Sequence, residues 1–366
     1  MRHLRFRFLA LGVVLMLAVP LVAACGSTTG GGGTTTGKTI KVGLVTDTGG
    51  LNDKSFNHLA YTGLLKAEHD LGVRGDVLQS VTQTDYVPNL THFAAQGYDL
   101  VIAVGFDMQV ALGQVSQTFP NTHFAIIDGS PTDANFNPVP RANVLSLFFR
   151  EQEAGALVGT VAGVLEKDQK TPKPTGVISA VGGQKIPPVD RYIAGYQWAA
   201  KMADPSIKVL VGYSNDFTDP TKCSGIANSQ FGQGSDVVFQ VAGGCGNGAL
   251  QAAGQKGVYS IGVDADQGFV DKSVIVSALK KVDVATFDSI KFIQDGSLPP
   301  DYQATGEAPC VASTRSCTEF LFNLKNGGVG YAVDNLNPLP SDVQTAVTNL
   351  ENAIKAGQQT PPETVS

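Results

Sequence analysis

Apolar, β-rich runs alternate with helix-like stretches along this 366-residue chain, and the alternation narrows the folds that it can adopt. The runs are apolar almost from end to end, and they cover residues 40–46, 100–104, 123–127, 144–149, 176–180, 208–213, 237–241, 258–263 and 274–279. The helix-like stretches between them include residues 55–70, 151–166, 191–203, 249–257 and 282–295. Strands of this composition are buried on both faces, which is typical of parallel sheets covered by helices. About nine strands are more than one compact lobe comfortably holds, so we expect an α/β fold with two sheets.

The first residues of the chain are expected to be a targeting segment and not part of the fold. Residues 1–24 place three arginines before an apolar run at 8–24, as a secretory signal peptide does. A single membrane-spanning helix is the alternative, because the run is only slightly shorter than the ~20 residues that cross a bilayer. Val22–Cys25 is similar to a bacterial lipobox, which predicts a lipid on Cys25 and an extracytoplasmic chain anchored to the membrane. Residues 25–38 are almost wholly Gly, Ser and Thr after the cysteine, so we expect a flexible tether there.

The charge and the motifs of the chain exclude several classes of function. The formal net charge is −6, and removal of the three arginines of the expected signal peptide makes it −9. An acidic body of this kind does not suit a nucleic acid as partner. No cofactor is expected, and the signatures G-x-S-x-G and H-E-x-x-H do not occur in the sequence. Asp264-Ala-Asp266 could be read as a metal motif, but no further ligands follow at calcium-loop spacing, so no metal site is predicted.

Beyond Cys25, the chain has four cysteines, and an even number in an exported chain favours two disulfides. We expect Cys310–Cys317 to close a local loop and Cys223–Cys245 to join neighbouring loops. The spacing of these cysteines does not fit a zinc site. Free buried thiols remain the alternative.

Polar residues follow four of the apolar runs at the point where each run ends: Asp47, Asp128, Gly243 and Asp264. The carboxyl ends of parallel strands meet at one edge of a sheet, and open α/β sheets bind ligands at that edge. We therefore expect these four residues to face one cleft.

The segment Lys41–Asn57 is the clearest of these strand ends. It reads as a buried strand, a glycine turn, and a helix that is expected to open on Asp53. Phe56 and Asn57 would then lie in the first turn of the helix, beside the ligand edge. The alternatives are that Phe56 belongs to the helix core and that Asp53 and Asn57 only cap the helix. For Asp53, capping is the expected role.

Six further segments stand along the chain in an informative order: Ala95–Phe106, Phe119–Asp128, Phe149–Gly155, Asp236–Gly244, Ile261–Gln267 and Ser277–Asp283. Together with Lys41–Asn57, they closely resemble the basic membrane protein (Bmp) family, the nucleoside-binding lipoproteins of ABC transporters. The resemblance implies the fold of type I periplasmic binding proteins, in which two doubly wound parallel-sheet lobes are joined by a three-crossing hinge. The N-terminal lobe would comprise residues 39–148 and about 276–300. The C-terminal lobe would comprise residues 149–275 and about 318–358, with a frayed tail at 361–366.

The resemblance also implies ligand-binding roles for eight residues. These are the stacking residues Phe56 and Phe217, the base-edge partners Asn57 and Asp128, the pocket-closing Asp47, and the sugar contacts Gly243, Asp264 and Lys280. Lys280 could instead begin a solvated helix beside Lys281.

On this reading the chain is a lipid-anchored receptor outside the cytoplasm, and it is not an enzyme. It would bind a purine nucleoside between two closing lobes and present it to an ABC transporter permease. One alternative keeps the fold and binds another ring-bearing solute, such as a flavin or a sugar derivative. The other is a surface sensor or adhesin without a role in transport.

Overall fold

The computed structural model of the chain describes residues 39–295 and 319–365. The expected signal peptide, the tether with Cys25 and the expected bridge Cys310–Cys317 lie outside these residues. Among the helices in the described part, none combines the length and the apolar character that a bilayer-spanning helix needs.

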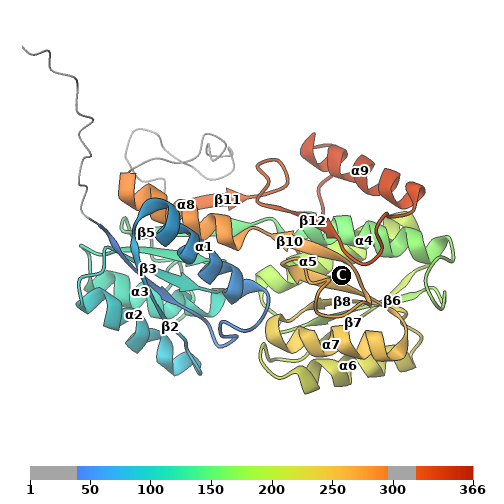
Figure 1. The fold of residues 1–366 in the computed structure, drawn as a ribbon, viewed down its shortest axis with the longest axis horizontal. Coiled ribbons are helices and arrows are strands. Elements are labelled where there is room, and N and C mark those ends of the chain that lie inside the picture. The colour runs from blue at the N-terminus through green and yellow to red at the C-terminus, as the bar shows by residue number, and fades with distance from the viewer. Residues whose placement is uncertain (1–38, 296–318, 366) are drawn as a thin grey trace, which may run out of the picture. The chain divides into compact units, whose positions relative to one another are not determined.

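The first sheet has six strands in the order β11-β5-β4-β3-β1-β2, and all neighbouring strands in it are parallel. The strands are β1 (Lys41–Val45), β2 (Arg74–Leu78), β3 (Leu100–Val104), β4 (His123–Ile127), β5 (Val144–Phe149) and β11 (Glu319–Phe322). Figure 1 shows α1 (Phe56–Leu71) and α8 (Val282–Asp295) on one side of the sheet, and α2 (Tyr86–Ala95) and α3 (Gln109–Thr118) on the other. Two short 3-10 turns, η1 (Gln83–Asp85) and η2 (Phe106–Met108), precede α2 and α3. We call this unit the N-terminal lobe.

The second sheet also has six strands, in the order β12-β10-β9-β8-β6-β7. They are β6 (Val177–Gly182), β7 (Lys208–Tyr213), β8 (Val237–Val241), β9 (Tyr259–Asp264), β10 (Val274–Lys280) and β12 (Val329–Val333). All pairs are parallel except β10 with β12, which is antiparallel. On one side lie α4 (Glu151–Lys167), α5 (Pro187–Ala203) and α9 (Ser341–Lys355), and on the other α6 (Pro220–Gly232) and α7 (Gly243–Lys256) (Figure 1). We call this unit the C-terminal lobe.

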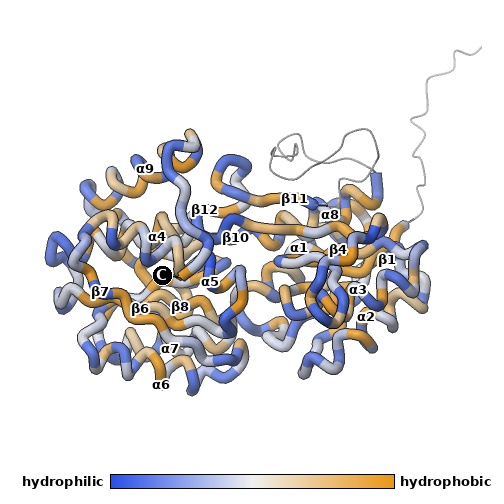
Figure 2. Tube along the Cα trace, turned by 180° about the vertical axis from the view of Figure 1, so that it is seen from behind, coloured by the Kyte–Doolittle hydropathy of each residue, from blue (hydrophilic) through white to orange (hydrophobic). Residues whose placement is uncertain are grey.

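One inner strand of each sheet is buried along its whole length. Every residue of β3 and of β8 is buried, as expected for strands covered by helices on both faces. Figure 2 shows these apolar strands in orange, and much of the blue, hydrophilic trace on the outer turns of helices and in loops. Removal of this apolar surface from water is the main contribution to the stability of each lobe.

Two glycines allow the helices α4 and α5 to approach closely. A Cβ atom on Gly155 would lie 2.1 Å from the carbonyl oxygen of Tyr192, and one on Gly195 would lie 2.0 Å from that of Gln152. Both distances are far below van der Waals contact, so larger residues would push the helices apart. The first turns of α4 and α5 are thereby brought together beside the cleft.

Within residues 39–295 and 319–365, the chain passes between the lobes three times, as expected for a three-crossing hinge. The crossings follow β5, follow β10, and lie between β11 and β12. Backbone hydrogen bonds tie them to one another: Arg150 N donates to Phe322 O at 2.8 Å, and Lys281 N donates to Gly328 O at 2.9 Å.

The sheets place two lobe boundaries differently from the sequence analysis. The boundary expected at about 276 falls inside β10, but the whole of β10 pairs within the C-terminal lobe, so the chain crosses after Lys280. The boundary expected at about 318 would assign β11 to the C-terminal lobe. β11 instead pairs with β5 in the N-terminal lobe, and the last crossing comes after Phe322.

The expected fraying of the C-terminal tail is wrong for residues 361–365. Pro361 is buried, and Val365 packs against the hydrophobic core. Glu363 forms an ion pair with Arg191, with 3.6 Å between its Oε2 and the arginine Nε. The tail therefore lies against α5, next to the hinge.

Candidate ligand-binding site

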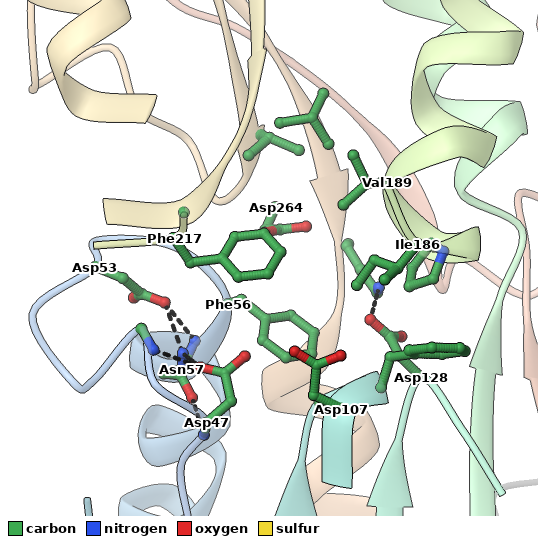
Figure 3. Close-up of a pocket in the computed structure, with 18 of the residues that line it drawn as sticks. Asp47, Asp53, Phe56, Asn57, Asp107, Asp128, Ile186, Val189, Phe217 and Asp264 are labelled. Carbon is green, nitrogen blue, oxygen red and sulfur yellow. Dashed lines mark hydrogen bonds and ion pairs between the residues drawn. The ribbon is translucent and has the colours of Figure 1, made fainter. Parts of the chain in front are cut away.

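A pocket of about 610 Å³, including its mouth, lies between the lobes at the carboxyl ends of both sheets. Its lining includes all eight residues that the sequence analysis selected: Asp47, Phe56, Asn57, Asp128, Phe217, Gly243, Asp264 and Lys280. The four residues at strand ends therefore face one cleft, and the other four, whose ligand-binding roles the family resemblance implied, line the same pocket. Figure 3 shows Asp47, Phe56 and Asp128 of the N-terminal lobe converging with Phe217 and Asp264 of the C-terminal lobe.

Asp53 caps α1 from outside the helix. The helix begins at Phe56 rather than at Asp53, because residues 53–55 form a turn before it. The Asp53 carboxylate accepts hydrogen bonds from the N–H groups of Ser55, Asn57 and His58 at 2.8–3.1 Å. These are donors that the first turn of a helix leaves without a partner. Capping is thus the role that Asp53 has in this structure.

Asn57 is buried and joins Asp53 to Asp47. Its amide nitrogen donates to Oδ1 of Asp47 at 2.7 Å and to Oδ2 of Asp53 at 3.1 Å, and its Oδ1 accepts from the N–H of Asp47 at 3.2 Å. Figure 3 shows Asn57 between the two acids. Both amide hydrogens are therefore used within the protein, and Asn57 orients Asp47.

Asp47 presents a carboxylate oxygen to the pocket. Its Oδ1 accepts from Asn57 and from the N–H of Gly49 at 2.8 Å, while its Oδ2 makes no hydrogen bond with the described residues. Desolvation raises the pKa of Asp47 to about 7, although the bonds from Asn57 and Gly49 lower it. Asp107 raises it further by like-charge repulsion.

Lys280 is buried among acids at the lobe boundary, which rules out the alternative of a solvated helix start. It is 2% exposed and ends β10. Its Nζ lies 2.6 Å from Oδ2 of Asp128 and 2.8 Å from Oε1 of Glu151. Burial lowers the pKa of Lys280, but the two carboxylates outweigh it and raise the pKa above its usual value. Arg191 joins the same cluster, with 3.2 Å between its Nη1 and Oε2 of Glu151.

Asp128 has one buried oxygen without a hydrogen-bond partner. Its Oδ2 binds Lys280, but its Oδ1 is buried and has no partner among the described residues. Burial raises the pKa of Asp128 to about 7, with Lys280 opposing and Glu151 adding to the shift. A buried unpaired oxygen is costly, so this atom is where a ligand donor gains most.

Asp264 is held by one donor from each lobe. The hydroxyl of Ser55 donates to its Oδ2 at 2.7 Å, and that of Tyr192 donates to its Oδ1 at 3.0 Å. Each carboxylate oxygen keeps a further lone pair, so Asp264 can still accept from a ligand.

The two aromatic rings come from different lobes. Figure 3 shows Phe217 above Phe56 in the pocket. The ammonium of Lys280 lies 5.0 Å from the centre of the Phe56 ring, within the range of a cation–π contact. Phe56 also packs partly against the hydrophobic core, so it combines a core role with a pocket role.

The N-terminus of α7 forms another wall. Gly243 opens this helix with a φ of +53°, a conformation that glycine adopts without strain. Helix N-termini carry free N–H groups and partial positive charge, which suit ligand oxygens. The structure contains the disulfide Cys223–Cys245, which joins α6 to α7 just behind this wall.

Several side chains of the described residues bond across the cleft, Lys280 with Asp128 among them, so the lobes are in contact around the pocket. Besides Ser55 with Asp264, Asn247 donates to the carbonyl of Asp53 at 3.2 Å and Gln267 to that of Lys54 at 3.2 Å. Gln184 donates to Oδ2 of Asp107 at 2.9 Å. This is the arrangement of a closed cleft.

Sequence reasoning missed several residues of the site. Glu151, Ser55, Tyr192 and Asp107 were not selected as site residues. The signal for Glu151 and Asp107 was present, because each acid follows closely on a buried strand. Ser55 and Tyr192 act on Asp264 from distant parts of the chain, and nothing in their local sequence indicates it.

The acids of the pocket are not arranged as a metal centre. Within residues 39–295 and 319–365, no group of three or more His, Cys, Asp or Glu side chains is placed to hold a metal ion.

Comparison with known proteins agrees with this geometry. Residues 40–305 match the Bmp family model, described as ABC transporter substrate-binding protein PnrA-like. The chain is 31% identical to the ABC transporter nucleoside-binding protein BmpA of Lactococcus lactis, over 97% of this chain and 99% of that protein. It is 33% identical to an uncharacterized lipoprotein of Pyrococcus horikoshii, with 79% and 72% covered.

A solved structure agrees with the fold as well. An ABC transporter solute-binding protein from Aeropyrum pernix matches with a TM-score of 0.74 and 26% identity, over 88% of this chain and 94% of that one. The family resemblance carried by the sequence motifs is thereby confirmed. The chain belongs to the Bmp family of PnrA-like ABC transporter substrate-binding proteins, and it is a solute-binding protein rather than an enzyme.

Proposed function

We propose that the solute is a purine nucleoside, held in the pocket between the closed lobes. The observation that carries the proposal is the pairing of two aromatic rings, Phe56 and Phe217, with carboxylate oxygens that have no protein partner. Stacking of a base on aromatic rings contributes ~1–3 kcal/mol per base. The relative from Lactococcus lactis, which is named a nucleoside-binding protein, supports the same ligand class.

The base edge is expected to meet acceptors. Asn57 has used both amide hydrogens, so in this structure it orients Asp47 instead of donating to a ligand. Asp47 Oδ2 is open to the pocket, and Asp107 lies near enough to repel it. Two neighbouring carboxylates favour a ligand edge rich in N–H donors, because such donors stabilise both charges. Guanosine and inosine carry such donors and are the first ligands to test.

The ribose is expected to lie between Asp128, Asp264 and the N-terminus of α7. The unpaired Oδ1 of Asp128 and the remaining lone pairs of Asp264 can accept from hydroxyl groups. The free N–H groups at Gly243 can donate to them. In this proposal Lys280 acts mainly by holding Asp128, since its ammonium is already bonded to two carboxylates.

Closure then serves transport. The bonds of Asp264 with Ser55 and of Asp107 with Gln184 form only when the lobes meet, so the closed surface reports an occupied pocket to the permease. Lipid on Cys25 would keep the receptor near the membrane. Replacement of Cys25 by Ser should release the receptor from the membrane fraction, which immunoblotting of cell fractions measures; a variant that stays membrane-bound would contradict the anchor.

Calorimetry with guanosine and inosine on the ligand-free receptor tests the proposal. Phe56→Ala removes one stacking face and is expected to weaken binding by ~1–3 kcal/mol. Phe136→Ala is the matched control, because Phe136 is 62% exposed and does not line the pocket. Unchanged affinity in Phe56→Ala, or no binding of either nucleoside by the wild type, would overturn it.

A deoxyribonucleoside separates this ligand from a different ring-bearing solute. If acids and N–H groups hold the sugar hydroxyls, 2′-deoxyguanosine should bind about tenfold or more weakly than guanosine, because buried polar groups lose a partner. Equal binding of the two compounds would contradict the assigned ribose contacts.

A further inference from the structure

Phe217 stands on a loop, whereas the other pocket ring stands on a helix. Residues 214–219 connect β7 to α6 and carry Phe217 near their centre. The strand side of the loop is anchored, since Ser214 N donates to Gly182 O and Asn215 N to Gly183 O, both at 2.9 Å. A Cβ on Gly183 would lie 2.2 Å from the ring, so the ring rests directly on backbone.

A second set of bonds fixes the turn itself. Oδ1 of Asp216 accepts from the N–H groups of Thr218 and Asp219 at 2.7 and 3.1 Å. Its Oδ2 accepts from Nζ of Lys222 at 2.6 Å. The turn is thus tied to the first residues of α6.

The helix side of the loop is tied to the disulfide. Cys245 N donates to the carbonyl oxygen of Phe217 at 2.9 Å. Cys245 is bonded to Cys223 in α6, with 5.5 Å between the Cα atoms. A Cβ on Gly248 would lie only 1.9 Å from Pro220 O, so α6 and α7 are pressed together at the same place. Phe217 and the N-terminus of α7 at Gly243 are therefore parts of one cross-linked unit.

We propose that Cys223 and Cys245 are positioning residues for ligand binding: their disulfide holds the Phe217 loop against the start of α7 and so presents the ring to the base. The proposal rests on the proposed nucleoside site, and it gives the disulfide as the feature that organises the C-terminal half of that site. An ordered ring costs less entropy to immobilise when the ligand binds, which increases affinity without a new contact. Both cysteines are fully buried, which favours this role over that of an exposed redox switch.

A double-mutant cycle tests the inference with guanosine in a calorimeter. The double variant Cys223→Ala/Cys245→Ala is compared with the wild type, and the same pair is then added to Phe217→Ala. Loss of the disulfide is expected to weaken binding by about 3- to 10-fold in the wild type and to have little effect once the Phe217 ring is gone. Phe56→Ala is the matched background, because Phe56 lies in the other lobe; there the disulfide effect should persist in full.

Each other outcome contradicts the proposal. An equal loss in the wild-type and Phe217→Ala backgrounds would mean that the disulfide only stabilises the lobe, and no loss in the wild type would mean that the loop is ordered without it. If the wild type binds neither guanosine nor inosine, the proposed function fails and this inference with it. If the variant without cysteines does not fold, Lys222→Met provides the second cycle. Lys222→Met is a change at the protein surface that removes the bond from the lysine ammonium to Asp216. The effect of Lys222→Met on guanosine affinity should likewise vanish in the Phe217→Ala background.

Discussion

The two halves of the pocket differ in chemistry. The N-terminal lobe contributes four carboxylates to the lining: Asp47, Asp53, Asp107 and Asp128. The C-terminal lobe contributes an apolar wall, with Ile186, Pro188, Val189, Val241 and Val263. Acids make directional hydrogen bonds, whereas an apolar wall excludes water and strengthens those bonds. The comparison predicts that the first lobe supplies most of the acceptors for a ligand, and that the second, apart from Asp264, mainly bounds the shape of the ligand.

Lys280 is an exception to this division, because it belongs to the C-terminal sheet and neutralises an acid of the N-terminal lobe. Lys280→Met leaves Asp128 and Glu151 buried without their ammonium. Removal of one partner from a buried ion pair costs ~3–5 kcal/mol, so we expect a loss of that size in the free energy of unfolding. Urea denaturation at pH 8 measures it.

The neighbouring lysine supplies the control. Lys281 is half-buried at the hinge, and its backbone N–H makes the crossing contact. Lys281→Met should stay within ~0.5 kcal/mol of the wild type, as surface changes do. Equal losses in the two variants would show that charge pairing across the lobes is not what stabilises this junction.

The acids of the N-terminal lobe predict a pH dependence of ligand binding. Desolvation raises the pKa of Asp47 to about 7, and a ligand N–H needs the ionised form. Binding therefore releases a proton, and guanosine affinity should rise with pH, by up to ~10-fold per unit below pH 7. Calorimetry from pH 5.5 to 8.5 should show a flatter profile for Asp47→Asn.

The effect of the same group on folding has the opposite sign. Because the pKa of Asp47 is raised above its ordinary value of 3.8, its contribution to stability is fully present below that pH and is lost as the pH rises through 7. A wild-type affinity that is flat or falls with rising pH would contradict the assignment of Asp47 as an acceptor.

The apolar wall predicts the smallest effect. Val189→Thr keeps the shape of a residue that is 6% exposed but adds a hydroxyl to the wall. Without a partner that hydroxyl costs ~1 kcal/mol, so guanosine affinity should fall about fivefold. Val209→Thr, on β7 and outside the pocket lining, should leave affinity unchanged. A gain of affinity in Val189→Thr would mean that the ligand is polar on this side, against the comparison.

The sequence predicted the inner strands well, but of the edge strands in the described sheets it predicted only β7. The expected strand at 100–104 has the bounds of β3, because five consecutive buried apolar residues leave few alternatives. β2 was missed, since Arg74, Gly75 and Asp76 break its apolar pattern at the edge of a sheet. β12 was also missed. It too lies at the edge of a sheet, and most of its residues are only half-buried. Edge strands depend on their neighbour and not on their own composition.

The site also has features that the sequence predicts and features that it does not. Residues at strand ends, such as Asp47 and Asp264, could be predicted because a parallel sheet gathers its carboxyl ends. Contacts between lobes could not, because Ser55 and Asp264 are separated by 209 positions and meet only in the closed form. Lys280 combines a predictable feature with an unpredictable one. Its place at a strand end was visible, but its partners Asp128 and Glu151 come from two other segments.

The threefold passage between the lobes has a consequence for how the chain reaches its native state. The first sheet needs β11 at residues 319–322, so it is incomplete until almost the whole polypeptide has been made. No single cut of the backbone would yield two intact lobes. The lobes therefore cannot fold to completion one after the other as the chain is made. The two halves of the receptor must be completed together, and a break in late synthesis would leave both of them unfinished.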